Sequence, residues 1–147
     1  MNVSEAVKDF HTKFSIRKAH PTDSQAMRFR MKLIAEEFLE VIQAAGFGFN
    51  GTEVSEWRFI PGPCFPPGLE EASRGAVNAN LLKELADLAY VIYGTAEALG
   101  WDLDEAIKRV HASNMSKIGA DGKPIYRSDG KVLKGPTYKE PDLTDLV

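Results

Sequence analysis

Apolar residues recur at spacings of three and four between residues 22 and 45, which is the pattern of a helix with one buried stripe. Thr22-Asp23-Ser24-Gln25 has the form of a capping box just after Pro21, so the helix is expected to start at Thr22. Gly46 is a natural stop for it. The apolar stripe consists of Met27, Met31, Ile34, Phe38, Val41, Ile42 and Ala45.

Three further segments show helical periodicity. The longest begins at about Asn78 and ends at Gly100, and a shorter one follows the capping pair Asp102 and Glu105. A weaker segment covers Ser4 to Lys13 and groups Val7, Phe10 and Phe14 on one side. Four helices predict an all-α domain of the four-helix bundle type. The apolar positions of the two stronger segments are Leu81, Leu82, Leu85, Leu88, Ala89, Ile92, Ala96, Leu99, Ala106, Ile107, Val110 and Met115.

Two stretches do not fit helices. Residues 46–80 contain a proline-rich run at 61–68 and are expected to form a long inserted loop, which the aromatic residues Trp57, Phe59 and Phe65 should keep ordered. The tail, residues 118–147, has short apolar segments on both sides of Ser128-Asp129-Gly130, and this pattern predicts a short β-hairpin.

The composition is that of one globular domain spanning residues 1–147, with 44% hydrophobic and 27% charged residues. The formal net charge of -3 argues against a protein that holds nucleic acid by bulk charge. The single cysteine, Cys64, excludes an internal disulfide, and three histidines provide no structural zinc site. No apolar run approaches the roughly 20 residues of a membrane span, so we expect a cytoplasmic protein with no membrane partner.

Five carboxylates follow the helical stripes. Glu36, Glu37 and Glu40 lie within five residues on the first long helix, and Glu84 and Asp87 repeat an i,i+3 spacing on the next. Carboxylates that converge between two helices repel one another and lose hydration unless cations neutralise them. Oxygen ligands without histidine or cysteine suit Mg²⁺, or Mn²⁺ in its place, rather than zinc.

The simpler interpretation is a solvated acidic surface, because glutamate is a good helix former and is mostly exposed. The second acidic pair favours the metal site over that interpretation. Nearby basic residues are sufficient for ordinary surface pairing but do not follow the acidic stripe, which adds mild support for a metal. They are Arg28, Arg30, Lys32 and Lys83.

Glu36-Glu37-x-x-Glu40 followed by Glu84-x-x-Asp87 resembles the signature of the MazG-type all-α nucleoside triphosphate pyrophosphatases, over about Ser4 to Lys117. This superfamily includes dimeric dUTPases and phosphoribosyl-ATP pyrophosphohydrolases. The resemblance implies a Mg²⁺-dependent enzyme that hydrolyses the α,β bond of its substrate and releases pyrophosphate. It implies Glu37 as the proton acceptor, and Glu36, Glu40, Glu84 and Asp87 chiefly as metal ligands. It also implies that Asn114 and Lys117 reach the substrate phosphates.

Other residues are candidates from their chemistry. A nucleobase needs an apolar slot, and aromatic rings stack on bases, so Phe14, His11 and Trp57 are candidates for this contact. Lys134 of the tail joins Lys117 as a cation that would stabilise the charge developing on pyrophosphate. Burial in the core for the rings and a solvated tail for Lys134 are the competing interpretations.

The leading hypothesis is a pyrophosphatase of nucleoside or deoxynucleoside triphosphates, with dUTP-directed house-cleaning as one form of it. A phosphoribosyl-ATP pyrophosphohydrolase is the first alternative. A metal-stabilised helical interaction module without turnover is the second. A single two-helix carboxylate hairpin leaves apolar faces open, so we expect a homo-oligomer, and the resemblance implies a homodimer or a homotetramer.

Overall fold

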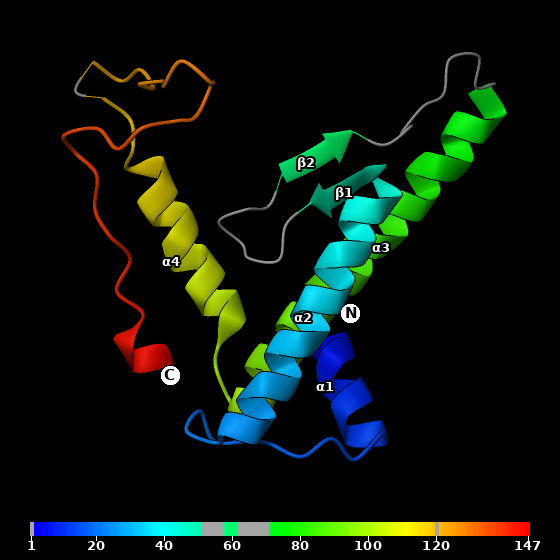
Figure 1. Ribbon diagram of the computed structural model, residues 1–147. Coiled ribbons are helices and arrows are strands. Elements are labelled where there is room, and N and C mark those ends of the chain that lie inside the picture. The colour runs from blue at the N-terminus through cyan, green and yellow to red at the C-terminus, as the bar shows by residue number, and fades with distance from the viewer. Residues whose placement is uncertain (1, 51–57, 62–70, 120) are drawn as a thin grey trace.

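A computed structural model describes residues 2–50, 58–61, 71–119 and 121–147. Figure 1 shows four helices, as the sequence predicts, together with a small antiparallel strand pair in the connection between the second and third. The elements are α1 (Val3–Lys13), α2 (Ser24–Ala44), β1 (Phe47–Asn50), β2 (Arg58–Pro61), α3 (Glu71–Leu99), α4 (Leu103–Met115) and the 3-10 turn η2 (Thr144–Leu146).

Side chains close the N-terminal ends of the helices. Asn2 and Glu5 form a reciprocal capping box on α1, with both hydrogen bonds at 2.9 Å. The cap of α2 is Asp23, so the predicted start at Thr22 is wrong by one residue. Asp23 Oδ1 accepts from two backbone amides at 3.0 Å, whereas the hydroxyl of Thr22 lies 2.8 Å from a ring nitrogen of His20.

Glycines end the two long helices, and both predicted stops are confirmed. Gly46 follows α2 with φ 75° and Gly100 follows α3 with φ 77°, a left-handed conformation that favours glycine. The capping role of Asp102 is confirmed too, because its side chain accepts from the amide of Glu105 at 3.0 Å. The glycines therefore set the C-terminal ends of α2 and α3, and Asp102 sets the start of α4.

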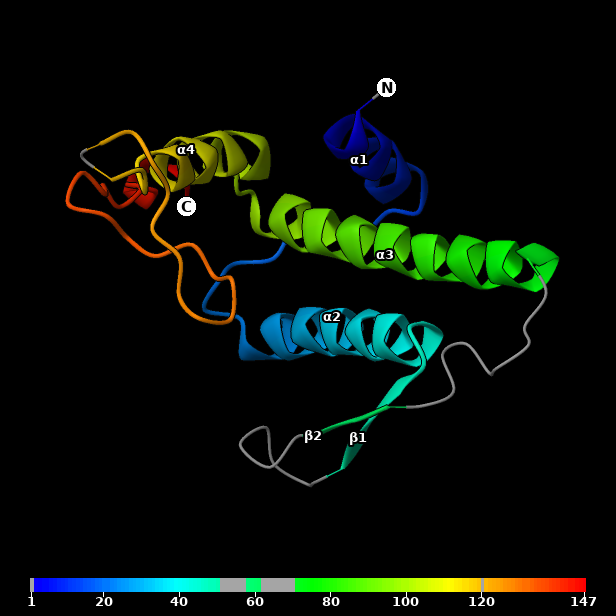
Figure 2. The same cartoon turned by 90° about the horizontal axis from the view of Figure 1, so that it is seen from above.

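The centre of the fold is α3, which lies between α1 and α2 (Figure 2). Val7 of α1 is fully buried, and the ring of Phe10 packs edge-on against Tyr90 of α3 with centroids 5.7 Å apart. The C-terminal part of α3 contributes most of the remaining buried apolar residues, and α2 runs antiparallel to α3 along its other side (Figures 1 and 2). The α2–α3 pair therefore carries the predicted acidic residues, and we call this pair the frame.

α4 turns away from this frame (Figure 1). Hydrogen bonds from Ser4 and Tyr93 to Asp104 tie its first turn to α1 and α3, and the tail holds the rest of the helix. The hydroxyl of Ser113 donates to the carbonyl of Lys139 at 2.7 Å, and Thr137 donates to the carbonyl of Ile118 at 2.6 Å. Arg109 donates to the carbonyl of Asp142 at 3.0 Å and pairs with the carboxylate of Asp145. The tail thus runs back along α4 as a strap of hydrogen bonds.

Two expectations for the non-helical stretches are corrected. α3 begins at Glu71 rather than at about Asn78, and β1 pairs with β2 inside the stretch expected to be loop. The predicted hairpin of the tail is not supported, since residues 121–147 contain no strand and only one antiparallel bridge, between Tyr126 and Val132. Both residues are exposed, so the bridge buries no face that would extend it. Within the described residues, no helix is long and apolar enough to cross a membrane.

Candidate active site

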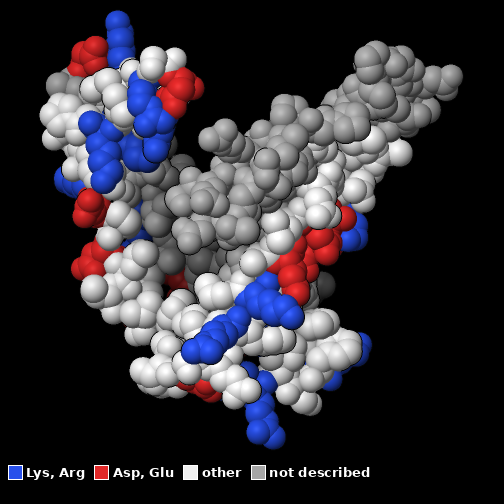
Figure 3. All heavy atoms as spheres, viewed as in Figure 1, with Lys and Arg blue, Asp and Glu red and all other residues white. Residues whose placement is uncertain are grey.

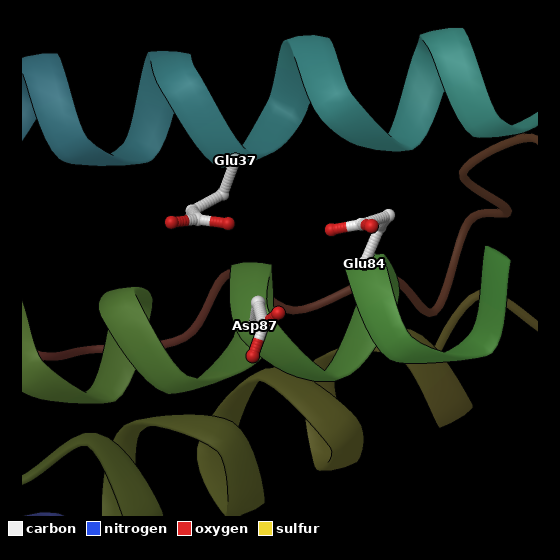
Figure 4. Close-up of side chains that lie close together, drawn as sticks. All are labelled: Glu37, Glu84 and Asp87. Atoms are coloured by element: carbon white, nitrogen blue, oxygen red, sulfur yellow. The ribbon is translucent and has the colours of Figure 1, made fainter. Parts of the chain in front are cut away.

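Three of the five predicted carboxylates meet between α2 and α3. Glu37 projects from α2 toward Glu84 and Asp87 of α3, and each side chain offers one oxygen within 4.8 Å of the others (Figure 4). Glu84 is buried, and the other two are half-buried. The i,i+3 spacing on α3 places its two acids on the face toward α2, as the sequence predicts. We call Glu37, Glu84 and Asp87 the carboxylate triad.

The surroundings of Glu37 disfavour its charged form. Burial raises the pKa of Glu37 above its ordinary value, and the negative charges of Glu40, Asp87 and Glu84 raise it further, against a smaller opposite effect of Lys83. A carboxylate with a raised pKa is a better proton acceptor than an ordinary one. Glu37 therefore has the electrostatic setting of a general base.

Lys83 takes part in the site, although the sequence presents it as a surface counter-charge. Its ammonium lies 3.1 Å from Glu84 and 2.9 Å from Asp87, and these hydrogen bonds raise the pKa of Lys83 above its ordinary value. The signal in the sequence was the i,i+4 spacing between Lys83 and Asp87, at which side chains of opposite charge can pair. The lysine neutralises part of the acidic charge on α3.

The other two predicted ligands lie outside the triad. Glu36 pairs with Lys32 at 3.5 Å on the exposed side of α2, because one residue turns a helix by about 100° and carries Glu36 away from α3. Glu40 is exposed and lies beside the triad, where it borders a hollow of about 390 Å³. The hollow is lined by Glu40, Gln43, Ala44, Asn80 and Glu84.

Of the predicted base-stacking residues, His11 and Phe14 do not lie at the triad. His11 is buried against α3, where a Cβ on Gly94 would lie 3.4 Å from its ring nitrogen. Phe14 is 63% exposed at the end of α1 and lies 4.4 Å from Phe10 between ring centroids. Trp57 lies outside the described residues. The contact of these rings with substrate stays a prediction.

The predicted phosphate-binding residues belong to α4 and the tail. Asn114 is exposed and Lys117 half-buried at the end of α4, which diverges from the α2–α3 pair, so this chain does not bring them to the triad (Figure 1). Lys134 lies 3.3 Å from Glu140 and 4.2 Å above the ring of Tyr138. In Figure 3, lysine and arginine gather at the upper left, over the end of α4 and the chain that follows. The predicted phosphate-binding residues and the carboxylate triad thus occupy separate parts of one chain.

One buried charge was missed by sequence reasoning. Arg30 is only 9% exposed, and burial lowers its pKa. Its guanidinium carbon lies 5.7 Å from the ring centroid of Phe29, and within the described residues it makes no ion pair or hydrogen bond. Arg30 lies seven residues before Glu37 on α2, two turns away on nearly the same face. No signal in the sequence separates it from the exposed arginines nearby.

The arrangement resembles a hard-cation site more than a structural acidic patch. Three carboxylates supply oxygen ligands only, which is the chemistry that Mg²⁺ and Mn²⁺ prefer. No histidine or cysteine joins the group among residues 2–50, 58–61, 71–119 and 121–147. The residues present therefore fit the divalent cation that the sequence predicts.

Comparison with known proteins bears on the chemistry of this site. A search of curated proteins gives no match to the chain. The model of the family described as phosphoribosyl-ATP pyrophosphohydrolase matches residues 7–114, a span that contains α2 and α3, most of α1 and nearly all of α4. The family lies within the MazG-type superfamily that the acidic motif resembles. The match covers more than half of the chain and includes the whole triad, so the chain belongs to the phosphoribosyl-ATP pyrophosphohydrolase family of nucleotide pyrophosphohydrolases.

Proposed function

We propose that the protein hydrolyses the α,β-phosphoanhydride bond of a nucleoside 5′-triphosphate and releases pyrophosphate. The observation that carries this proposal is the convergence of Glu37, Glu84 and Asp87 from two facing helices, with oxygens within 4.8 Å of one another. The family match supports the reaction class, because pyrophosphate release from a nucleotide is the activity of that family. The products are a nucleoside monophosphate and pyrophosphate.

Mg²⁺ is the proposed cofactor, with Mn²⁺ as a substitute. Glu37, Glu84 and Asp87 would hold it, and Glu40 lies close enough to Glu37 to add its negative charge to the site. When bound, such an ion neutralises phosphate charge and lowers the pKa of a coordinated water. The acidic groups of the chain supply the ligands that this role needs.

The chain itself supplies the proton acceptor. Water adds to a phosphorus atom, the bond from that phosphorus to the bridging oxygen breaks, and the water proton must go to a base. The position of Glu37 across from the α3 acids and its raised pKa support this residue as the base. Lys117 and Asn114 are proposed to bind the phosphates once α4 of one subunit meets the triad of another.

Two substrate classes share this bond. Canonical or modified nucleoside triphosphates, dUTP among them, fit a house-cleaning role. Phosphoribosyl-ATP is an ATP with a second sugar phosphate on its base, and the description of the matching family favours it. Both require the same anhydride chemistry, so the triad alone does not select between them.

The test is pyrophosphate release from a panel of nucleoside triphosphates, deoxynucleoside triphosphates and phosphoribosyl-ATP, with Mg²⁺, Mn²⁺ or EDTA. We expect metal-dependent release that Glu37→Gln lowers by about 100-fold or more, within the range that general bases contribute. Glu36→Gln is the matched control, because Glu36 is adjacent in sequence but faces away. Failure of every substrate in the panel would replace this proposal with a metal-stabilised module without turnover.

We also propose that the protein is a homo-oligomer, a dimer or a dimer of dimers. Exposed apolar residues follow α3 at heptad spacing, including Leu82 at 67%, Leu85 at 47% and Ile92 at 39% exposure. Met31 and Phe38 repeat this seven-residue spacing on α2, at 46% and 36% exposure. In each helix, the exposed apolar residues lie one position after the residues that face the partner helix, a rotation of about 100°. Because α2 and α3 are antiparallel, this rotation carries both sets of apolar residues to the same side of the pair. A second copy of the same face would bury them.

A further inference from the structure

A hollow of about 390 Å³ adjoins the carboxylate triad on the side away from Arg30. Glu40, Gln43 and Ala44 line it from α2, at spacings that put them on one helical face. Asn80 and Glu84 line it from α3, four residues apart. Glu84 belongs to both the hollow and the triad, so a ligand in the hollow lies directly beside the reacting end of the site.

The walls of this hollow favour the uncharged end of a nucleotide. They carry two carboxylates and two amides, and none of the described residues that line it is a lysine or arginine. Without a bound cation, a polyphosphate would meet repulsion from Glu40 and Glu84 there. The volume lies within the range of about 300–1,000 Å³ that is common for small-molecule sites.

We propose that the hollow receives the nucleobase and that Gln43 and Asn80 bind its hydrogen-bonding edge. This inference rests on the proposed function and names the part of the substrate that the site recognises. An amide both donates and accepts, so two amides on facing helices match the mixed edge of a base. They would act on binding and specificity, because neither belongs to the triad.

Glu40 makes the hollow selective among the bases. An ionised carboxylate only accepts hydrogen bonds, and it therefore favours a base with an exocyclic amino group. Adenine and cytosine present such a group where thymine and uracil present a carbonyl oxygen. The hollow should therefore prefer adenine and cytosine to uracil and thymine, which sets it against a dUTP-directed enzyme.

The test uses neutral nucleosides, whose binding requires neither metal nor turnover. Deoxyadenosine, deoxycytidine, deoxyuridine and thymidine are titrated into the full chain in EDTA, and the side-chain amide signals of Gln43 and Asn80 are followed by NMR. We expect both signals to shift and the two amino-bearing nucleosides to bind about 10-fold more tightly than the other two, the ratio set by one good base contact. Equal affinity for all four, or no shift of these two amides, would overturn the proposal.

Variants on the same helices provide the matched comparison. Glu40→Gln should reduce the preference to about 2-fold or less, because the preference comes from its carboxylate, whereas Gln43→Leu and Asn80→Leu should weaken the binding of all four nucleosides by about 10-fold. Gln25→Leu and Asn78→Leu change exposed amides of α2 and α3 that lie outside the lining, and should preserve both the affinity and the preference. Affinity that is unchanged in Gln43→Leu and Asn80→Leu would show that these amides do not bind the base.

The outcome is separable from that of the proposed reaction. Pyrophosphate release with no nucleoside preference would leave the reaction standing and reject the base site. Nucleoside binding that depends on Gln43 and Asn80, in a chain that releases no pyrophosphate from any substrate, would keep the base site and reject the hydrolase.

Discussion

Glu37 shows how position on a helix decides the role of a carboxylate. Glu36 and Glu37 are chemically identical neighbours, but a turn of about 100° gives the first a lysine partner in solvent and the second a place opposite two acids. The i,i+3 and i,i+4 spacings in the sequence identify the acidic stripe. They do not fix its rotation relative to the partner helix, and so they leave Glu36 and Glu37 equivalent until α2 is seen against α3.

Metal binding should separate the same two residues. Mg²⁺ at about 100 times its Kd is expected to add about 2.7 kcal/mol to the free energy of unfolding, because it binds the folded triad only. Glu36→Gln should retain this gain and Glu37→Gln should lose most of it, as measured by thermal unfolding with and without EDTA. An equal Mg²⁺ response in the two variants would remove Glu37 from the metal site.

The raised pKa of Glu37 predicts a pH dependence in the absence of metal. A carboxyl with a higher pKa in the folded state than in the unfolded state stabilises the fold when protonated. That contribution is fully present below the unfolded value of about 4.5 and is lost as the pH rises through the folded pKa. In EDTA, Glu37→Gln should therefore gain stability over the wild type on going from pH 4 to pH 8. A difference in melting temperature that is flat across this range would contradict the raised pKa.

Arg30 carries a buried charge that no described acid neutralises. Loss of hydration without pairing is unfavourable, so Arg30→Met, which keeps the length of the side chain, should raise the free energy of unfolding by about 1–4 kcal/mol. Arg28→Met on the exposed side should change it by about 0.5 kcal/mol or less. Chemical denaturation measures both, and a strong loss of stability in Arg30→Met would mean that the charge has a partner in the assembled protein.

At the scale of elements, local signals located the helices well. Capping residues and glycines act within one turn, so Asp102, Gly46 and Gly100 could be assigned from the sequence. The β1–β2 pair and the start of α3 could not, because paired residues such as Asn50 and Arg58 are separated by more than the two-residue turn that a sequence signal identifies, and the residues from 71 carry no apolar stripe. The tail hairpin was overpredicted for the opposite reason, since a good turn sequence forms strands only when one face is buried.

Val7 is the most deeply buried side chain of α1. Val7 is fully buried, so Val7→Ala should lower the free energy of unfolding by about 1–3 kcal/mol through lost apolar burial and the space left behind. Val3→Ala removes the same atoms from a position that is 44% exposed and should have little effect. Urea unfolding of the two variants compares them directly, and equal losses would show that α1 is not anchored through Val7.

For the whole molecule, the exposed apolar stripes of α2 and α3 support the proposed oligomer. Leu85→Lys places a charge in the exposed stripe of α3 and should lower the molecular mass found by light scattering to that of a monomer. Val147→Lys, at a position 78% exposed at the chain end, should leave the mass unchanged. A wild-type protein of monomeric mass would reject the oligomer and leave the apolar stripe unexplained.

Lys83 bears on the order in which the chain would fold and bind a metal ion. Its ammonium already lies against Glu84 and Asp87, so the acids of α3 reach their packed positions with a positive charge between them. If the proposed divalent ion binds, the helices can assemble first and the ion can follow, with the lysine moving out toward solvent, where more than half of its side chain already lies. Folding and metal binding would then be separate steps.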